Sequence, residues 1–68
     1  MTDTNELKRI IKASGKTMVA ISEQSGIERA TLYNKLNGKS IFNVSEIVGL
    51  CEALDLSVGD RNRIFFKK

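Results

Sequence analysis

The sequence contains no histidine, and its single cysteine is Cys51. A lone thiol cannot close a disulfide within the chain, and a structural zinc site needs about four Cys or His ligands. The chain has neither a histidine base nor paired carboxylates at a useful spacing, so no acid–base or nucleophilic site can be named. These absences argue against an enzyme, and we expect neither a metal nor a cofactor. Cys51 is interpreted as a small core residue.

Long apolar runs are also missing. No stretch approaches the roughly 18 residues that a membrane span needs, and no signal-peptide pattern opens the chain. We therefore expect a soluble, cytoplasmic protein with one domain over residues 1–68. A domain of this size buries only about 60% of the surface that its unfolded chain exposes. Because neither a disulfide nor a metal is available to add stability, a second copy of the chain is favoured as support.

Positive and negative charges are segregated along the chain. Residues 1–42 carry seven basic and four acidic side chains, and residues 43–60 carry four acidic and no basic ones. Residues 61–68 carry four basic and no acidic ones, which brings the formal net charge to +3. This pattern suits a basic face toward a polyanion and an acidic back. It is equally compatible with a solvated surface whose charge is merely uneven.

No proline interrupts the chain, so glycines and capping residues mark the ends of the predicted helices. Apolar residues recur at helical spacing over residues 5–14, which predicts a first helix. Thr17 is the expected N-cap of a second helix over residues 18–24. Gly26 can adopt the positive φ that ends this helix, and a third helix follows over residues 28–36. A turn of three to four residues with a glycine between two short helices is typical of a helix-turn-helix.

The second half of the chain predicts two more helices. Residues 39–42 form a connecting loop, in which Ile41 and Phe42 are expected to pack against the core. Asn43 followed by Glu46 predicts a capping box that starts the fourth helix, and Ser57 is a weaker start signal for a last helix. Six apolar residues predict a wide, mostly buried surface on the fourth helix: Val44, Ile47, Val48, Leu50, Cys51 and Leu54. The sum is an all-α bundle of about five short helices with no strand.

Residues 17–38 read TMVAISEQSGIERATLYNKLNG. This stretch resembles the helix-turn-helix of the Cro/C1-type (XRE-like) phage repressors, with a Thr cap, a small residue at Ser22, Gly26 four residues later and a terminal Asn-Gly. The resemblance implies a lambda-repressor-like fold, a helix-turn-helix unit over about 17–37, sequence-specific binding of double-stranded DNA and transcriptional repression. Two positions depart from the family pattern. Ser22 stands where Ala is usual, and Lys35 stands where an apolar residue is usual, with Leu36 taking over the packing.

Helical geometry selects the candidates for base recognition on the third helix. At about 100° per residue, the direction opposite Leu32 is occupied by Ala30, Tyr33, Asn34 and Asn37. A merely solvated face would usually carry Glu and Lys instead. Asn can bond adenine through two hydrogen bonds, Tyr can pack on thymine methyls, and Ala permits a close approach. The predicted base-reading residues are Arg29, Ala30, Tyr33 and Asn34.

Contacts with phosphates position such a domain without specifying sequence. The start of the second helix offers free N–H groups and a partial positive charge, which suit a phosphate. The predicted phosphate-contacting residues are Lys16, Thr17, Lys35, Asn37, Lys39 and Ser40. Glu28 could accept a hydrogen bond from cytosine, but stabilisation of the first helical turn is the preferred interpretation.

The alternative function is a protein-interaction module that modulates another repressor or a toxin without binding DNA itself. The polar face of the third helix favours DNA, whereas a large apolar patch there would have favoured the alternative. One copy of this helix spans too few base pairs to single out an operator, so we expect a weak or DNA-assisted homodimer on a palindromic operator. Ile64, Phe65 and Phe66 either cap the core or form the dimer seam. No small-molecule ligand and no membrane contact are expected.

Overall fold

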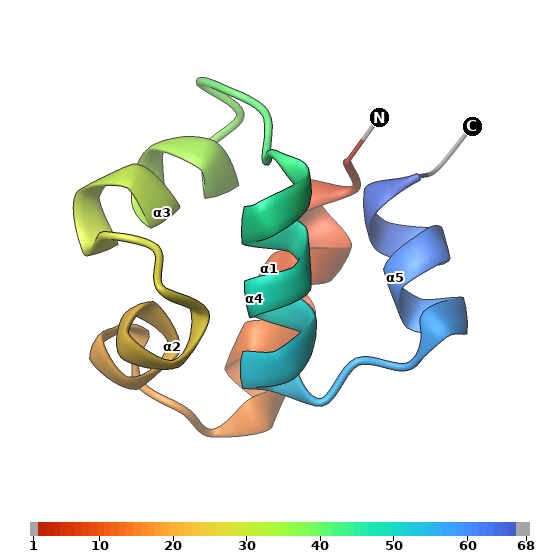
Figure 1. Cartoon of the computed structure of the whole chain (residues 1–68), viewed down its shortest axis with the longest axis horizontal. Coiled ribbons are helices and arrows are strands. Elements are labelled where there is room, and N and C mark those ends of the chain that lie inside the picture. Colours follow the sequence, from red (N-terminus) through yellow and green to blue (C-terminus); the bar gives the residue numbers. More distant parts are fainter. Residues whose placement is uncertain (1, 67–68) are drawn as a thin grey trace.

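The computed structural model of the chain describes residues 2–66, which form five helices and no strand. The helices are α1 (Thr4–Ser14), α2 (Met18–Ser25), α3 (Arg29–Leu36), α4 (Val44–Leu54) and α5 (Val58–Phe65). In Figure 1, α4 crosses the middle of the molecule in front of α1, with α2 and α3 on one side and α5 on the other. The predicted all-α bundle of five short helices is confirmed. None of the helices within residues 2–66 has the length and apolar character of a membrane span.

Capping side chains start four of the five helices. Asn43 Oδ1 accepts the N–H of Glu46 at 2.8 Å, and Glu46 Oε1 accepts the N–H of Asn43 at 2.9 Å, which completes the predicted capping box. Ser57 and Asp60 form the same reciprocal pair before α5. α3 differs, because Glu28 occupies its N-cap without a side-chain hydrogen bond. The helix therefore begins one residue later than predicted.

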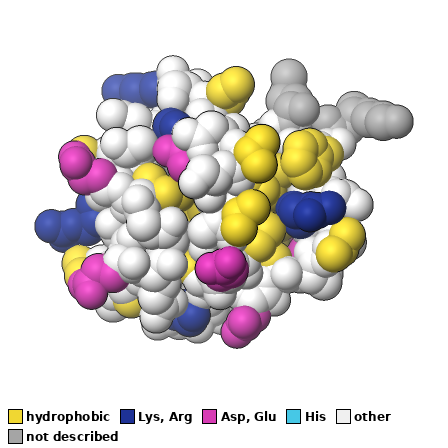
Figure 2. All heavy atoms as spheres, viewed as in Figure 1, with side chains coloured by type: hydrophobic (Ala, Val, Ile, Leu, Met, Phe, Trp, Pro, Cys, Tyr) yellow, Lys and Arg dark blue, Asp and Glu magenta, His cyan; other side chains and the backbone are white. Residues whose placement is uncertain are grey.

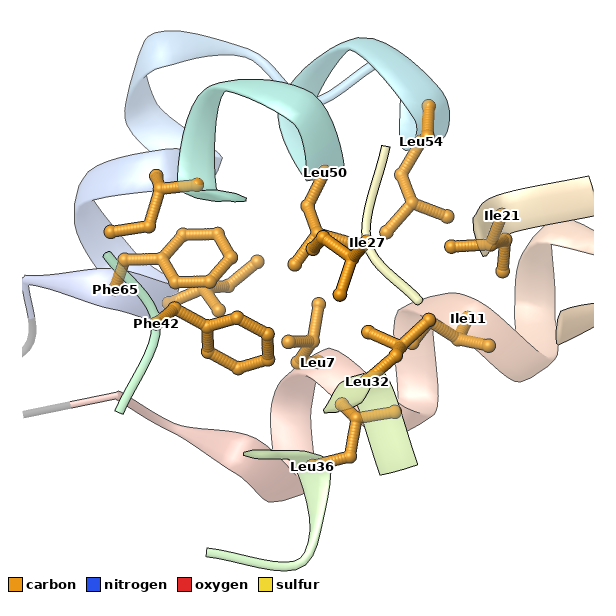
Figure 3. Close-up of a cluster of buried hydrophobic side chains, with 13 residues drawn as sticks. Leu7, Ile11, Ile21, Ile27, Leu32, Leu36, Phe42, Leu50, Leu54 and Phe65 are labelled. Atoms are coloured by element: carbon orange, nitrogen blue, oxygen red, sulfur yellow. The ribbon is translucent and has the colours of Figure 1, made fainter. Parts of the chain in front are cut away.

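A single cluster of apolar side chains, each less than a tenth exposed, holds the five helices together (Figure 3). It consists of Leu7, Ile11, Ile21, Ile27, Leu32, Leu36, Phe42, Ile47, Leu50, Ala53, Leu54, Ile64 and Phe65. Phe42 and Phe65 meet edge to face at one end of the cluster, with ring centroids 5.7 Å apart. Ile21 and Leu54 lie at the other end. Phe42 thus links the loop after α3 to α5.

Three apolar residues that the sequence placed in the core lie on the surface. Ile41 is 83% exposed, Val44 74% and Val48 50%. The prediction for Ile41 is wrong because its neighbour Phe42 alone reaches the core from this loop. The prediction of a wide buried surface on α4 is wrong for Val44 and Val48, which lie on the side of the helix away from the buried Leu50.

The three apolar residues at the end of the chain divide between core and surface. Ile64 is completely buried and Phe65 is 4% exposed, so both belong to the core and neither forms a dimer seam. Phe66 is 52% exposed, and the Arg61 guanidinium lies over its ring, with Cζ 5.9 Å from the ring centroid. Cys51 is half-buried and packs against the core, where burial raises the pKa of its thiol.

Gly49 allows α4 to cross α2 at close range. These two helices make the most extensive approach between helices in the described chain. A Cβ atom at Gly49 would lie 2.2 Å from the carbonyl oxygen of Ser25 and 3.0 Å from its carbonyl carbon. Both atoms belong to the backbone at the end of α2, immediately before the turn that leads to α3. The position of α2 therefore depends on the absence of a side chain at Gly49.

Glu6 ties α1 to α5. Its carboxylate accepts hydrogen bonds from Arg9, with Nε 2.6 Å from Oε1, and from Arg63. The guanidinium of Arg9, followed by that of Arg63, lowers the pKa of Glu6 from 4.5 to about 2. A backbone hydrogen bond of 2.6 Å from the N–H of Asp3 to the carbonyl oxygen of Ile64 joins the same two parts of the chain.

Acid should weaken this tie over a defined pH range. The pKa of Glu6 is lower in the folded chain than its ordinary value of 4.5, so the contact stabilises the fold fully above that pH. Its contribution is lost as the pH falls toward about 2. We expect the urea midpoint, followed by circular dichroism, to fall more steeply with acid in the wild type than in Glu6→Gln. Parallel pH profiles for the two proteins would contradict this role of Glu6.

Candidate nucleic-acid interface

The turn between α2 and α3 is fixed by two serine hydroxyls and one glycine. Gly26 has φ of 76°, in the left-handed region that favours glycine, and its N–H donates to the carbonyl oxygen of Ser22 at 3.0 Å. The hydroxyl of Ser22 donates to the carbonyl oxygen of Ile27, and Ser25 Oγ accepts the N–H of Ile27 at 3.3 Å. The hydroxyl of Ser22 therefore supplies a hydrogen bond that holds the turn.

α3 turns its leucines inward and its polar residues outward, as predicted. Leu32 is completely buried and Leu36 is 5% exposed, whereas Tyr33 is 49% exposed. The residues of the exposed side, here called the α3 outer face, are Arg29, Ala30, Tyr33 and Asn34. No other described residue forms a hydrogen bond or ion pair with the side chains of this face. The structure thus brings all four predicted base-reading residues onto one surface with their polar groups available.

Four of the six predicted phosphate contacts lie exposed around this face: Thr17, Asn37, Lys39 and Ser40. Thr17 is the N-cap of α2, where its Oγ1 accepts the N–H of Ala20 at 3.1 Å. Lys39 and Ser40 follow α3 in the loop to α4. The N–H of Lys39 donates to the carbonyl oxygen of Asn34 at 3.0 Å, so this loop is held against the end of α3.

The other two predicted phosphate contacts are lysines that bind within the protein. Lys16 Nζ donates to Gln24 Oε1 at 3.1 Å and to the carbonyl oxygen of Ala53, at the C-terminal end of α4. Lys35 Nζ lies 2.5 Å from Glu46 Oε1, near the opposite end of the same helix, and its side chain is 14% exposed. Ala53 is 37 residues from Lys16, and Glu46 is 11 residues from Lys35, so local spacing gave no sign of these two contacts. The structure does not bring either ammonium group to the α3 outer face.

α1 brings two further lysines to the edge of α3, which the sequence analysis missed. Lys8 and Lys12 are exposed, and with Tyr33 and Asn37 they line a shallow hollow whose remaining wall is apolar. They lie four residues apart and therefore share one side of α1. Sequence spacing shows that they share a side, but only the packing of α1 on α3 shows that this side borders Tyr33.

A second exposed surface lies on α4, beside the loop that carries Lys39. Ile41, Val44, Val48 and Phe66 form it, and we call it the α4 apolar surface. Figure 2 shows hydrophobic side chains gathered over α4 and α5 on the face toward the viewer. Ile41, Val44 and Phe66 line one hollow, and Val48 lies one helical turn beyond Val44. At least half of each of these side chains is exposed.

Comparison with known families identifies the fold. The chain matches the Cro/C1-type HTH DNA-binding domain over residues 6–62, from α1 into α5. Comparisons with curated proteins and with solved structures found no match. The matched range includes the Gly26 turn, the α3 outer face and the loop to α4, and the family is one of DNA-binding domains rather than enzymes. The chain therefore belongs to the Cro/C1-type helix-turn-helix family of DNA-binding domains.

Proposed function

We propose that this domain binds double-stranded operator DNA sequence-specifically through α3 in the major groove, and that it represses transcription as a phage or prophage regulator in the cytoplasm. The α3 outer face carries the proposal, because its polar groups have no partner among the described residues. An α-helix fits the major groove. Asn34 would bond adenine, Arg29 would reach guanine or a phosphate, and Tyr33 would pack on thymine methyls. Ala30 would permit the close approach.

Phosphate contacts on both sides would hold α3 in the groove. Thr17 and the free N–H groups at the start of α2 supply one set, and Asn37, Lys39 and Ser40 supply the other. Lys8 and Lys12 add positive charge at the Tyr33 edge. Lys16 and Lys35 are left out of the interface, because the protein itself binds their ammonium groups.

Selection of duplexes from a random pool, followed by titration at several salt concentrations, tests the DNA-binding proposal. We expect one enriched sequence and an affinity that falls linearly on a log–log plot, by about 0.9 units per neutralised phosphate. Absence of enrichment, or binding that does not respond to salt, would overturn the proposal. Placing the selected site over a promoter then tests repression, because an unaffected reporter would leave DNA binding intact and remove the repressor role.

The α4 apolar surface is proposed as the contact between two copies of the domain on DNA. Two copies double the number of base contacts and require a palindrome with half-sites about 34–36 Å apart. Glu52 and Arg61 border one hollow beside Val48, and neither has an ion pair within residues 2–66, so two copies facing each other could pair them. Stable interfaces bury about 800 Å² on each partner. Four partly exposed side chains supply less, which supports a weak or DNA-assisted dimer.

Val44→Glu should separate this contact from half-site binding. Val44 is the first residue of α4, where an acidic side chain suits the helix dipole and should not disturb the fold. We expect affinity for a full palindrome to fall about tenfold and affinity for a half-site to stay unchanged, as measured by fluorescence anisotropy. Half-site affinity is the internal control, because half-site binding needs no second copy of the domain. Unchanged palindrome binding by the Val44 variant would place the dimer contact elsewhere.

A further inference from the structure

Lys35 lies on the helix proposed to read DNA, yet its charge is directed into the protein. Its Nζ is 2.5 Å from Glu46 Oε1, and the two side chains are only 14% and 16% exposed. Lys8, Lys12 and Lys39, in contrast, are exposed and form no ion pair with any other described residue. Lys35 is therefore the one lysine in residues 2–66 that forms an ion pair. Its partner belongs to a different helix, so the contact joins the end of α3 to the start of α4.

The carboxylate of Glu46 makes two contacts at once. The same Oε1 atom that pairs with Lys35 accepts the N–H of Asn43 at 2.9 Å and closes the capping box of α4. Burial acts to raise the pKa of Glu46, but the hydrogen bonds from Lys35 and from the N–H of Asn43 keep it below its ordinary value. The carboxylate therefore stays ionised and pairs with Lys35 wherever the domain is folded near neutral pH.

The pair closes the base of the loop over residues 37–43. Backbone hydrogen bonds from Gly38 to Lys35 and from Lys39 to Asn34 hold the start of this loop on α3. Asn43, at the other end, is held by Glu46. Lys35 and Glu46 bridge the two ends of the loop, and Lys39 lies between these ends.

We propose that Lys35 is a positioning residue and not a DNA contact: its pairing with Glu46 fixes the loop over residues 37–43 beside α3 and keeps one positive charge away from the phosphates. The inference rests on the proposed function, because it concerns how the domain meets DNA. Stability alone does not account for the pair, since replacing a partly buried ion pair by apolar residues is often neutral or stabilising.

Variants of the pair distinguish a positioning role of Lys35 from a direct contact with a phosphate. Glu46→Gln keeps an oxygen that can accept the N–H of Asn43, and it removes the negative charge that pairs with Lys35. We expect the salt dependence of binding to steepen by about 0.9 units, as for one additional phosphate contact. The ratio of operator to scrambled-duplex affinity should fall several-fold. Lys35→Met should lower that ratio without changing the salt dependence, and Lys35→Arg should restore the wild-type ratio, because Arg can pair with Glu46.

Lys39→Met is the matched control and should flatten the salt dependence by about 0.9 units. If Lys35→Met flattens it equally, Lys35 contacts a phosphate and the inference is wrong. The inference would also be wrong if Lys35→Met or Glu46→Gln kept both the wild-type ratio of operator to scrambled-duplex affinity and the wild-type salt dependence. If the wild-type protein shows no salt-dependent DNA binding, the proposed function itself is wrong. Circular dichroism confirms that each variant is folded, and the apolar Lys35→Met keeps the test decisive if Glu46→Gln unfolds.

Discussion

Replacing Gly49 with alanine is expected to destabilise the fold by about 3 kcal/mol, although alanine is the better helix former. The added Cβ would lie 2.2 Å from the carbonyl oxygen of Ser25, and a backbone atom cannot move aside as a flexible side chain can. α2 and α4 would have to separate, which would open the core where Ile21 meets Leu54. For a chain of 68 residues, a loss of this size is a large part of a total of roughly 3–10 kcal/mol.

Gly59→Ala is the matched control for this prediction. Gly59 is also helical, but a Cβ there would meet nothing closer than Ser57 Oγ at 3.7 Å. Alanine should therefore leave the stability unchanged or raise it by up to about 1 kcal/mol. Urea unfolding followed by circular dichroism compares the two variants with the wild type. A Gly49→Ala protein as stable as Gly59→Ala would show that the two helices can separate without cost.

Removal of the Asn34 side chain should weaken specific DNA binding by about 1–3 kcal/mol, or roughly ten- to a hundredfold. Asn34 is exposed and engages no other described residue through its side chain, so Asn34→Ala should leave the fold intact. The loss should be confined to one base pair of the operator, where the variant should accept bases that the wild type rejects. Titration against operators altered at single positions measures both effects.

Asn62→Ala provides the matched amide deletion outside the proposed interface. Asn62 is exposed on α5, where its Oδ1 accepts a hydrogen bond from Arg61. Its removal should change neither the operator affinity nor the base preference. Unchanged affinity and preference in Asn34→Ala would mean that α3 does not read bases through this residue. Equal losses in both variants would point to a general effect on the fold.

Features that depend on neighbours in the sequence could be predicted from the sequence alone. The capping box of Asn43 and Glu46 is an interaction across three residues, and the faces of α3 follow from helical spacing around Leu32. The exposure of Ile41 and Val44 could not be predicted, because it depends on whether another part of the chain packs against them. Local spacing shows an apolar stripe, but it does not show that Phe42 alone suffices to fill the space beside Phe65.

Contacts between distant residues account for the remaining differences. Nothing near Lys35 or Lys16 in the sequence indicates a binding partner. Only the fold places Glu46 beside Lys35 and the carbonyl oxygen of Ala53 beside Lys16. Gly49 carries no sign of its importance, because its partner Ser25 lies on another helix. The proposed interface thus loses two lysines that the sequence had included, and it gains Lys8 and Lys12, whose nearness to Tyr33 arises from packing alone.

The hydrogen bond from Asp3 to Ile64 also bears on how the chain can be re-engineered. It brings the first and last parts of the described chain together at one side of the bundle, while α3 lies across the molecule from them (Figure 1). A short peptide linker could join two such neighbouring segments with little distortion, because neither segment would have to move. New ends could then be opened at the exposed Asp55, between α4 and α5 and remote from α3. A ring-closed or permuted domain of this kind would keep its proposed DNA-facing surface unobstructed.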